Sequence, residues 1–446
     1  MSLVRTLYSA LTWAAQPLLR RKLRRRALQE PGYAEAVPER FGHYQPADLG
    51  AEHRGQWLWI HAVSLGETRA AAILLQALRA QHPSLRLLLT HGTATGRAEG
   101  KKLLQPGDIQ VWQPWDSLDA TRRFVRQFRP AIGVLMETEI WPNLLAACRE
   151  AGVPVALANA RLNAKSLAGA QRWAALSQPA YQSLSAVWAQ TEDDAARLRQ
   201  LGVAVNGVFG NVKFDVVPDA QQLAQGHVWR AASDRPVVLL ASSREGEEVL
   251  WLAAVQRLRA QHAGGEGAAS AGRMPVQWLI VPRHPQRFDE VQQLIAAAGL
   301  SVSRRSQWTA GGTAHSSAAA DVWLGDSMGE MPLYYALAHA GLLGGSFERL
   351  GGQNLIEAAA CGCPMLLGPH TFNFAEAAEQ ACLAGAALRV ADMDAAVQQA
   401  TALVHDGVQL ARMQHDARAF AATHRGAAQA TAQAVLALAK PQGRVD

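Results

Sequence analysis

A glutamate that could act as a base follows the first strongly apolar run of the chain. Residues 57–63 read Trp-Leu-Trp-Ile-His-Ala-Val, which predicts a buried strand, and Ser64-Leu-Gly-Glu67 comes directly after it. Serine followed three residues later by glutamate is also a capping box, in which the carboxylate only accepts a hydrogen bond at a helix start. A strand-end carboxylate beside glycine is equally a place for a general base that takes a proton from an attacking hydroxyl. Taken alone, the pattern favours the cap.

Further charged side chains follow other predicted strands in the first half of the chain. Glu137 and Glu139 come just after the apolar run 132–136, and Trp141-Pro142 begins the next predicted helix. Carboxylates in a first helical turn are ordinary partners of the helix dipole, so a structural role is about as well supported as a binding role. Beside a binding edge they could instead accept hydrogen bonds from sugar hydroxyls. The candidates for binding an acceptor are Glu137, Glu139, Arg161 and Lys213.

The second half carries side chains suited to a phosphate and a ribose. Arg283 follows the predicted strand 277–281, where a guanidinium can bind a phosphate, although a lone strand-end arginine is often only a surface charge. The glycine-rich stretch 344–352 leads into a helix that we expect to begin near Asn354, and amides at a helix start bind anions. Glu357 lies on the same helix face as Asn354, so it could accept from two ribose hydroxyls or merely complete a cap.

One more loop could contact a base. Met328-Gly329-Glu330 follows the predicted strand 322–324, and its backbone could read the edge of a pyrimidine, although these residues do not specify which one. Neither a Gly-x-Gly-x-x-Gly motif after a strand nor a P-loop occurs in the sequence. Dinucleotide and ATP binding are therefore not indicated.

Two series of alternating strands and helices must position these candidates. Short apolar runs between helical stretches begin at 57–63 and start again at 237–241, as in the parallel sheets of α/β proteins. Ligands of such sheets bind at the carboxyl ends of the strands, so we expect two Rossmann-like domains that face an interdomain cleft. The expected divisions are 1–30 as anchor and basic segment, 31–215 as the first domain, 216–235 as a linker, 236–425 as the second domain, and 426–446 as a C-terminal helix and tail.

The charge of the chain is concentrated at its N-terminus. The 446 residues have a net charge of +6, and residues 1–30 alone hold seven basic residues and one acid. The remainder is neutral, which argues against a nucleic-acid binder. An apolar stretch over 3–15 precedes the basic cluster; it is short for a bilayer span and has the wrong charge order for a signal peptide. We expect an interfacial or barely spanning anchor on an anionic membrane surface, with a solvated helix packed on its own domain as the alternative.

Seven motifs follow one another along the chain. They are His61-Ala-Val-Ser-Leu-Gly-Glu67, Glu137-Thr-Glu-Ile-Trp-Pro-Asn143, Asn159-Ala-Arg-Leu162, Gly210-Asn-Val-Lys-Phe-Asp215, Pro282-Arg-His-Pro285, Gly325-Asp-Ser-Met-Gly-Glu330 and the segment 344–374. In this order they resemble the 3-deoxy-D-manno-octulosonic acid (Kdo) transferase family of lipopolysaccharide synthesis, from the N-terminus to about residue 375. The chain departs from the family pattern at Gln353 and Arg244, where His is usual, and at Ile356, where Pro is common. These departures concern contacts to the donor sugar.

The resemblance implies a GT-B glycosyltransferase that moves Kdo from CMP-Kdo to a lipid A precursor, lipid IVA, on the cytoplasmic side of the inner membrane. It makes Glu67 the catalytic base. It places the CMP of the donor on Pro282, Arg283, Met328, Gly329, Glu330, Asn354, Leu355, Ile356 and Glu357.

The implied chemistry is simple, because CMP is a good leaving group. One base and one anion site suffice for a single displacement with inversion, so neither a metal nor another cofactor is expected. Two other functions remain open. One is a nucleotide-sugar 2-epimerase of the same architecture, which would need no lipid anchor. The other is a non-catalytic, membrane-associated nucleotide-binding protein, in which Glu67 would be only a cap.

Overall fold

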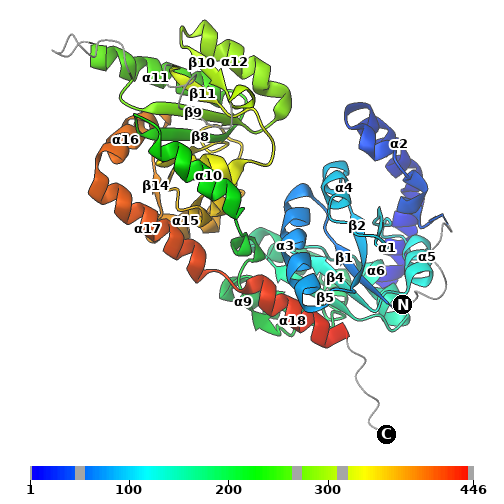
Figure 1. Ribbon diagram of the computed structural model, residues 1–446. Helices are drawn as coiled ribbons and strands as arrows, with labels where there is room; N and C mark the ends of the chain where they lie inside the picture. The colour runs from blue at the N-terminus through cyan, green and yellow to red at the C-terminus, as the bar shows by residue number, and fades with distance from the viewer. Residues whose placement is uncertain (1–2, 46–55, 264–273, 309–319, 440–446) are drawn as a thin grey trace. The chain divides into compact units, whose positions relative to one another are not determined.

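The structure, a computed structural model, describes residues 3–45, 56–263, 274–308 and 320–439. The chain divides into two compact units, which we call unit 1 (residues 1–215 with 425–446) and unit 2 (residues 216–424) (Figure 1). Each unit is a parallel sheet of seven strands with helices on its faces. The expected α/β class with two parallel sheets is therefore confirmed. That the two sheets face a common cleft stays a prediction.

The sheet of unit 1 has the strand order β3-β2-β1-β4-β5-β6-β7. Its strands are β1 Trp57–His61, β2 Arg86–His91, β3 Ile109–Trp112, β4 Ile132–Met136, β5 Val155–Ala160, β6 Ala186–Ala189 and β7 Gly207–Val208. Every residue of β1 is buried, with Trp57 and Trp59 in the hydrophobic cluster of one face and Leu58 and Ile60 in that of the other. Burial on both faces is why this strand is a continuous apolar run in the sequence.

The helices of unit 1 come from both ends of the chain. They are α1 Leu3–Ala14, α2 Gln16–Gln29, α3 Leu65–Gln81, α4 Ala94–Lys101, α5 Leu118–Phe128, α6 Pro142–Glu150, α7 Ala164–Arg172, α8 Ala174–Tyr181, α9 Glu192–Gln200 and α18 Ala427–Ala439. Helix α18 packs on α3, and Ala428, Ala432 and Val435 belong to the same buried cluster as Leu74 of α3. The C-terminal helix that we expected therefore completes the N-terminal unit.

The sheet of unit 2 has the order β10-β11-β9-β8-β12-β13-β14. Its strands are β8 Val237–Ser243, β9 Gln277–Pro282, β10 Val302–Arg304, β11 Val322–Leu324, β12 Ala340–Leu343, β13 Met365–Leu367 and β14 Ala387–Arg389. Its helices are α10 Ala220–Ala231, α11 Glu247–Ala263, α12 Phe288–Ala297, α13 Met331–Leu337, α14 Ile356–Ala360, α15 Ala375–Leu383, α16 Met393–His405 and α17 Gly407–Thr423.

Both sheets have a point at which the direction of strand addition reverses. In unit 1 it lies between β1 and β4, and in unit 2 between β8 and β12. The loops leaving two such strands diverge to opposite faces, which opens a crevice at the carboxyl edge where α/β proteins bind ligands. This position is therefore where chemistry is expected in each unit.

The segment 216–235 differs from the linker that we expected, because it contains α10. Asp219 caps this helix by accepting a hydrogen bond from the amide of Gln222 at 2.8 Å. Its Trp229 is buried, and the helix packs closely on α13 within unit 2. The polar composition of the segment reflects the exposed side of a short helix.

The N-terminal segment forms two helices, α1 and α2. Within the described ranges, no helix combines the length and hydropathy that a bilayer span requires. The polar side of α1 faces the unit: Tyr8 donates to Asp116 at 2.9 Å, Ser9 donates to Asn143 at 3.0 Å, and Arg5 pairs with Glu150 at 3.1 Å. The apolar residues of α1 are left outside.

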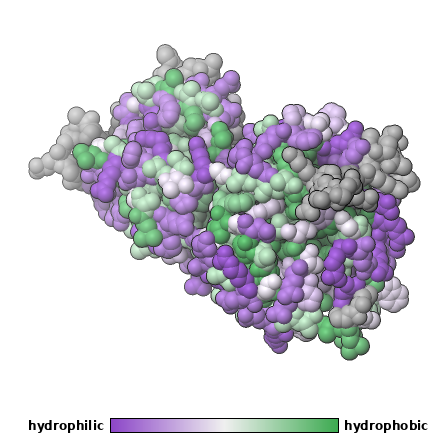
Figure 2. Space-filling model, turned by 90° about the horizontal axis from the view of Figure 1, so that it is seen from below, coloured by the Kyte–Doolittle hydropathy of each residue, from purple (hydrophilic) through white to green (hydrophobic). Residues whose placement is uncertain are grey.

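Apolar side chains emerge in patches between polar ones on the face shown in Figure 2. Among the described residues, five of the sixteen exposed large apolar side chains belong to α1: Leu3, Val4, Leu7, Leu11 and Trp13. Leu7 and Leu11 remain 62% and 61% exposed. Helix α1 is therefore amphipathic in the reverse of the usual sense, with its polar side against the protein.

Candidate active site

Glu67 lies in the first turn of α3, directly after β1. Its Oε2 accepts a hydrogen bond from the amide of Val63 at 2.8 Å, and its Oε1 accepts one from the Ser64 hydroxyl at 3.1 Å. Ser64 is the N-cap of the helix and accepts from the amide of Glu67 in return. The predicted capping interaction is present, although the amide that Glu67 binds belongs to the residue before the N-cap. The cap fixes the carboxylate in one orientation at the carboxyl edge of the sheet.

The environment of Glu67 favours its protonated form. Burial raises its pKa to about 7, and the negative charges of Glu137 and Glu139 act in the same direction. The hydrogen bonds from Val63 and Ser64 oppose this shift without cancelling it. A carboxylate with a pKa near neutrality is suited to accept a proton and to release it again.

Glu137 and Glu139 reach the same edge from β4, the neighbour of β1 across the reversal point. Lys213 donates to Glu137 at 2.7 Å, and the indole of Trp141 donates to Glu139 at 2.8 Å. Burial raises the pKa of Glu139, and the charge of Glu137 adds to that shift. The structure thus groups four of the residues singled out from the sequence around one position: Glu67, Glu137, Glu139 and Lys213.

The backbone that carries this group is strained. Glu137 has a φ of 60° and Asn159 a φ of 52°, values that L-residues adopt rarely and that concentrate at functional sites. The amide of Glu137 donates to Ala158, and the amide of Arg161 donates to the carbonyl of Glu137 at 3.2 Å. The side chain of Asn159 accepts from the amide of Val212, which fixes the turn that presents Lys213. Arg161 is therefore joined to the group through its backbone.

In unit 2, Arg283 leaves β9 at the edge next to the reversal point. Its amide donates to Ser243 at 2.9 Å, and its Nε donates to the side chain of Gln353 at 3.2 Å. Gln353 in turn closes the glycine-rich loop, because its amide donates to the carbonyl of Gly344 at 3.0 Å. The residue that departs from the family pattern at this position thus orients the guanidinium that we expect to bind phosphate.

A buried carboxylate that sequence reasoning missed holds the glycine-rich loop in place. Glu247, the first residue of α11, accepts hydrogen bonds from the amides of Gly345 at 2.7 Å, Phe347 at 3.0 Å and Arg244 at 2.9 Å. Its side chain is fully buried; burial raises its pKa, and the hydrogen bonds from these amides oppose that rise. The sequence signal was Ser-Arg-Glu-Gly-Glu-Glu at 243–248, which begins at the last residue of β8 and places Glu247 after that strand, as Glu67 comes after β1.

The loop Met328-Gly329-Glu330 follows β11 at the same edge. Glu330 pairs with Arg305 at 2.9 Å and accepts from the hydroxyl of Ser327. The Arg305 guanidinium lies 4.9 Å from the ring centre of Trp229 in α10. Met328 is 63% exposed, so the tip of the loop is accessible while its base is held by these contacts.

The helix expected to begin near Asn354 begins two residues later. Helix α14 is Ile356–Ala360, and Asn354 accepts from the amide of Ile356 at 3.0 Å in a turn before it. Glu357 lies in the first turn of this short helix and is partly exposed, whereas Leu355 and Ile356 are buried. Pro282 ends β9. The predicted nucleotide residues therefore come from the ends of three strands, β9, β11 and β12, that share one edge of the sheet.

Comparison with known proteins gives a family match. Residues 35–216 match the model of the family described as "3-Deoxy-D-manno-octulosonic-acid transferase (kdotransferase)". The 3-deoxy-D-manno-octulosonic acid transferase of Bordetella pertussis is 46% identical over 440 residues, which cover 97% of this chain and 98% of the relative.

Two solved structures resemble the fold. A glycosyltransferase from Rickettsia africae has a TM-score of 0.55 with 11% identity, and it covers 86% of this chain and 99% of its own. The UDP-GlcNAc 2-epimerase of Neisseria meningitidis has a TM-score of 0.51 with 15% identity and the same coverage of both chains. At these identities the likeness concerns the fold alone.

Proposed function

We propose that this chain, which belongs to the 3-deoxy-D-manno-octulosonic acid (Kdo) transferase family and is thus a glycosyltransferase, transfers Kdo from CMP-Kdo to a lipid A precursor, lipid IVA. The observation that carries this proposal is Glu67, held at the reversal point of unit 1 with its pKa raised to about 7. The 2-epimerase alternative has only a similarity of fold in its favour.

Glu67 is the proposed catalytic base. An acceptor hydroxyl placed at its carboxylate gives up its proton to the glutamate while the hydroxyl oxygen attacks the anomeric carbon of Kdo. The bond from that carbon to the phosphate of CMP breaks in the same step, and its electron pair leaves with CMP. A single displacement of this kind inverts the anomeric configuration. Glu137, Glu139 and Lys213 are the proposed contacts to acceptor hydroxyls.

The donor is assigned to the edge of unit 2. Arg283, oriented by Gln353, would neutralise the charge that grows on the departing phosphate. Glu357 would accept from the ribose hydroxyls, and the loop 328–330 would contact the base. Arg283 supplies the stabilisation that a metal ion gives in other transferases. Independence of metal ions remains a prediction.

The proposed place of work is an anionic membrane surface, on the cytoplasmic side of the inner membrane. Helix α1 presents Leu3, Leu7 and Leu11, four residues apart on one side, to the outside while its polar side is bound to the unit. Helix α2 carries six basic residues, Arg20, Arg21, Lys22, Arg24, Arg25 and Arg26, which anionic lipids attract. An exposed apolar side next to a basic helix is better accommodated at the surface of an anionic membrane than in bulk water.

Transfer is tested directly with CMP-Kdo and lipid IVA in detergent. The wild type should release CMP and add Kdo to the lipid, whereas Glu67→Gln should bind CMP as tightly and transfer at most about one hundredth as fast. Epimerised or merely bound donor without a glycosylated lipid would contradict the proposal.

Replacing Leu7 and Leu11 by serine should weaken vesicle binding and leave transfer in detergent unchanged. Both residues are exposed, so this variant tests the membrane placement alone.

A further inference from the structure

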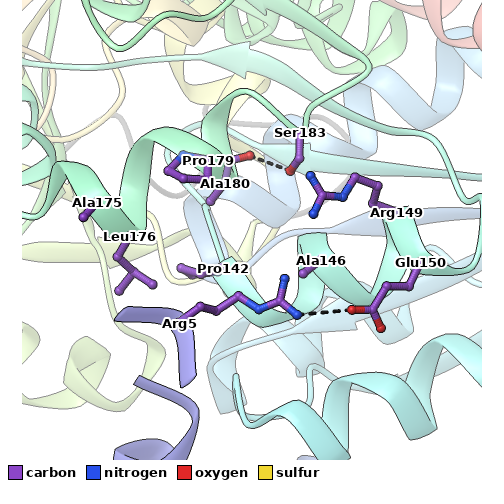
Figure 3. Close-up of a pocket in the computed structure, with 10 residues that line it drawn as sticks. All are labelled: Arg5, Pro142, Ala146, Arg149, Glu150, Ala175, Leu176, Pro179, Ala180 and Ser183. Carbon is purple, nitrogen blue, oxygen red and sulfur yellow. Dashed lines mark hydrogen bonds and ion pairs between the residues drawn. The ribbon is translucent and has the colours of Figure 1, made fainter. Parts of the chain in front are cut away.

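A cavity of about 360 Å³ lies between α1, α6 and α8 of unit 1, apart from the Glu67 group. Arg5 of α1 and Arg149 of α6 line it, and both guanidinium groups point toward the space between the helices (Figure 3). Its remaining wall is largely apolar, made by Pro142, Ala146, Leu176, Pro179 and Ala180. The proposed transfer reaction uses none of these residues.

Positive charge exceeds negative charge around this cavity. Glu150 is its single lining acid, and this carboxylate is shared between Arg5 at 3.1 Å and Arg122 at 2.9 Å. The guanidinium of Arg149 makes no hydrogen bond or ion pair with any described residue. Two guanidinium groups thus share one carboxylate, and the guanidinium of Arg149 is available to a ligand. Two guanidinium groups that reach a cavity from different helices suit a phosphate, whose oxygens can accept from both.

The position of the cavity indicates where such a phosphate comes from. Arg5 lies on the side of α1 that faces the unit, and Leu3, Val4 and Leu7 on the same helix are exposed. The exposed Trp173, two residues before Ala175 in the cavity wall, adds an aromatic side chain of the kind found at membrane interfaces. A cavity lined by two arginines under an outward-facing apolar helix lies at the depth of lipid headgroups when that helix lies in an interface.

We propose that this cavity binds the phosphate of a membrane-lipid headgroup, with Arg149 and Arg5 as its donors. The inference rests on the proposed membrane placement of α1 and adds a specific contact to it. The headgroup phosphate competes with Glu150 for Arg5 and pairs with Arg149. The apolar wall covers the first carbons of the lipid.

The test uses phosphatidylcholine vesicles with and without a minor fraction of phosphatidic acid. Arg149→Gln should weaken binding to the phosphatidic acid vesicles about five-fold, the effect of one phosphate contact at a membrane surface. Arg126→Gln is the matched control, because Arg126 is also an exposed arginine in the last turn of its helix, α5, and does not line the cavity. This control should change binding less than about two-fold.

Glu150→Gln should act in the opposite direction and strengthen binding, because Arg5 then loses its competing carboxylate. Equal losses for the two arginine variants, or weaker binding of Glu150→Gln, would overturn the proposal. Glycerol phosphate titrated by calorimetry examines the other source: if its binding depends on Arg149 while vesicle binding does not, the cavity takes a soluble phosphate instead. Kdo transfer in detergent, measured on the same preparations, separates failure of this inference from failure of the proposed function.

Discussion

Glu67 and Glu247 occupy equivalent places in the two units and are held in different ways. Each follows the strand beside the reversal point of its sheet and lies in the first turn of the next helix. Glu247 accepts from three backbone amides, two of them in the loop that follows the neighbouring strand, β12. Among the described residues, Glu67 accepts only from Val63 and Ser64 at the start of its own helix, and it lies near the two further carboxylates of Glu137 and Glu139. The same position in the fold thus holds a structural carboxylate in unit 2 and the proposed catalytic base in unit 1, and the difference lies in what the neighbouring strand supplies.

The largest expected effect follows from replacing Glu67 by glutamine. A glutamine can keep the cap, because its carbonyl oxygen can accept from Val63 and its amide can donate to Ser64. It cannot accept the proton, so turnover should fall by about 10²-fold or more. The melting temperature and the affinity for CMP should stay at their wild-type values. Activity above one tenth of wild type would leave Glu67 with the cap as its only role.

The same substitution at Glu247 should give the opposite result. Both of its oxygens accept from backbone N–H groups, so an amide nitrogen would face a donor whichever way the side chain turned. We expect Glu247→Gln to lower the free energy of unfolding by about 2–4 kcal/mol, measured by denaturant titration. Turnover per folded molecule should fall much less than in Glu67→Gln. A fully stable Glu247→Gln would remove the distinction between the two glutamates.

A smaller effect is expected at the proposed ribose contact. Glu357→Ala should weaken CMP binding by about 1–3 kcal/mol, because two hydroxyls lose a charged acceptor. Calorimetry with CMP measures this loss. Glu67→Gln, titrated alongside, should bind CMP like the wild type. Unchanged affinity in a folded Glu357→Ala protein would refute the assignment.

The smallest change concerns the pH dependence of the Glu67 group. With the pKa of Glu67 raised to about 7, kcat/KM should increase with pH through neutrality as the base loses its proton. Lys213 pairs with Glu137 at 2.7 Å, and its removal leaves the negative charge of Glu137 unopposed. Lys213→Met should therefore move the rise of kcat/KM to higher pH, by about half a pH unit to one pH unit. A profile that kept its wild-type position would show that Glu137 does not influence the base.

Much of the fold could be predicted because buried parallel strands are continuous apolar runs, as Trp57–His61 and Val237–Ser243 show. The order of strands within a sheet could not, since it depends on contacts between distant segments. Helix α10 was not predicted, because Pro218 and the polar composition of the segment indicated a linker. The helix buries only one short side, which includes Trp229. Its partner α13 is more than a hundred residues away.

The candidate site was predicted residue by residue, but not as a group. Motif spacing singled out Glu67, Glu137, Glu139 and Lys213 one at a time, while their proximity depends on β1 and β4 being neighbours. The role of Glu247 was missed for the same reason, because its amide partners lie about a hundred residues further on. The sequence indicates which side chains could act chemically, whereas the order of the strands determines which groups a buried carboxylate contacts.

The return of α18 to unit 1 has a consequence for how the protein is made. Unit 2 is contiguous and can fold as soon as residue 424 has left the ribosome, but unit 1 must wait for its last helix. Until then the side of α3 that carries Leu74 lacks its cover of Ala428, Ala432 and Val435. A chain that ended near residue 425 would contain all of unit 2 joined to an incomplete unit 1. Helix α18 therefore contributes to the stability of α3, the helix that carries Glu67 in its first turn.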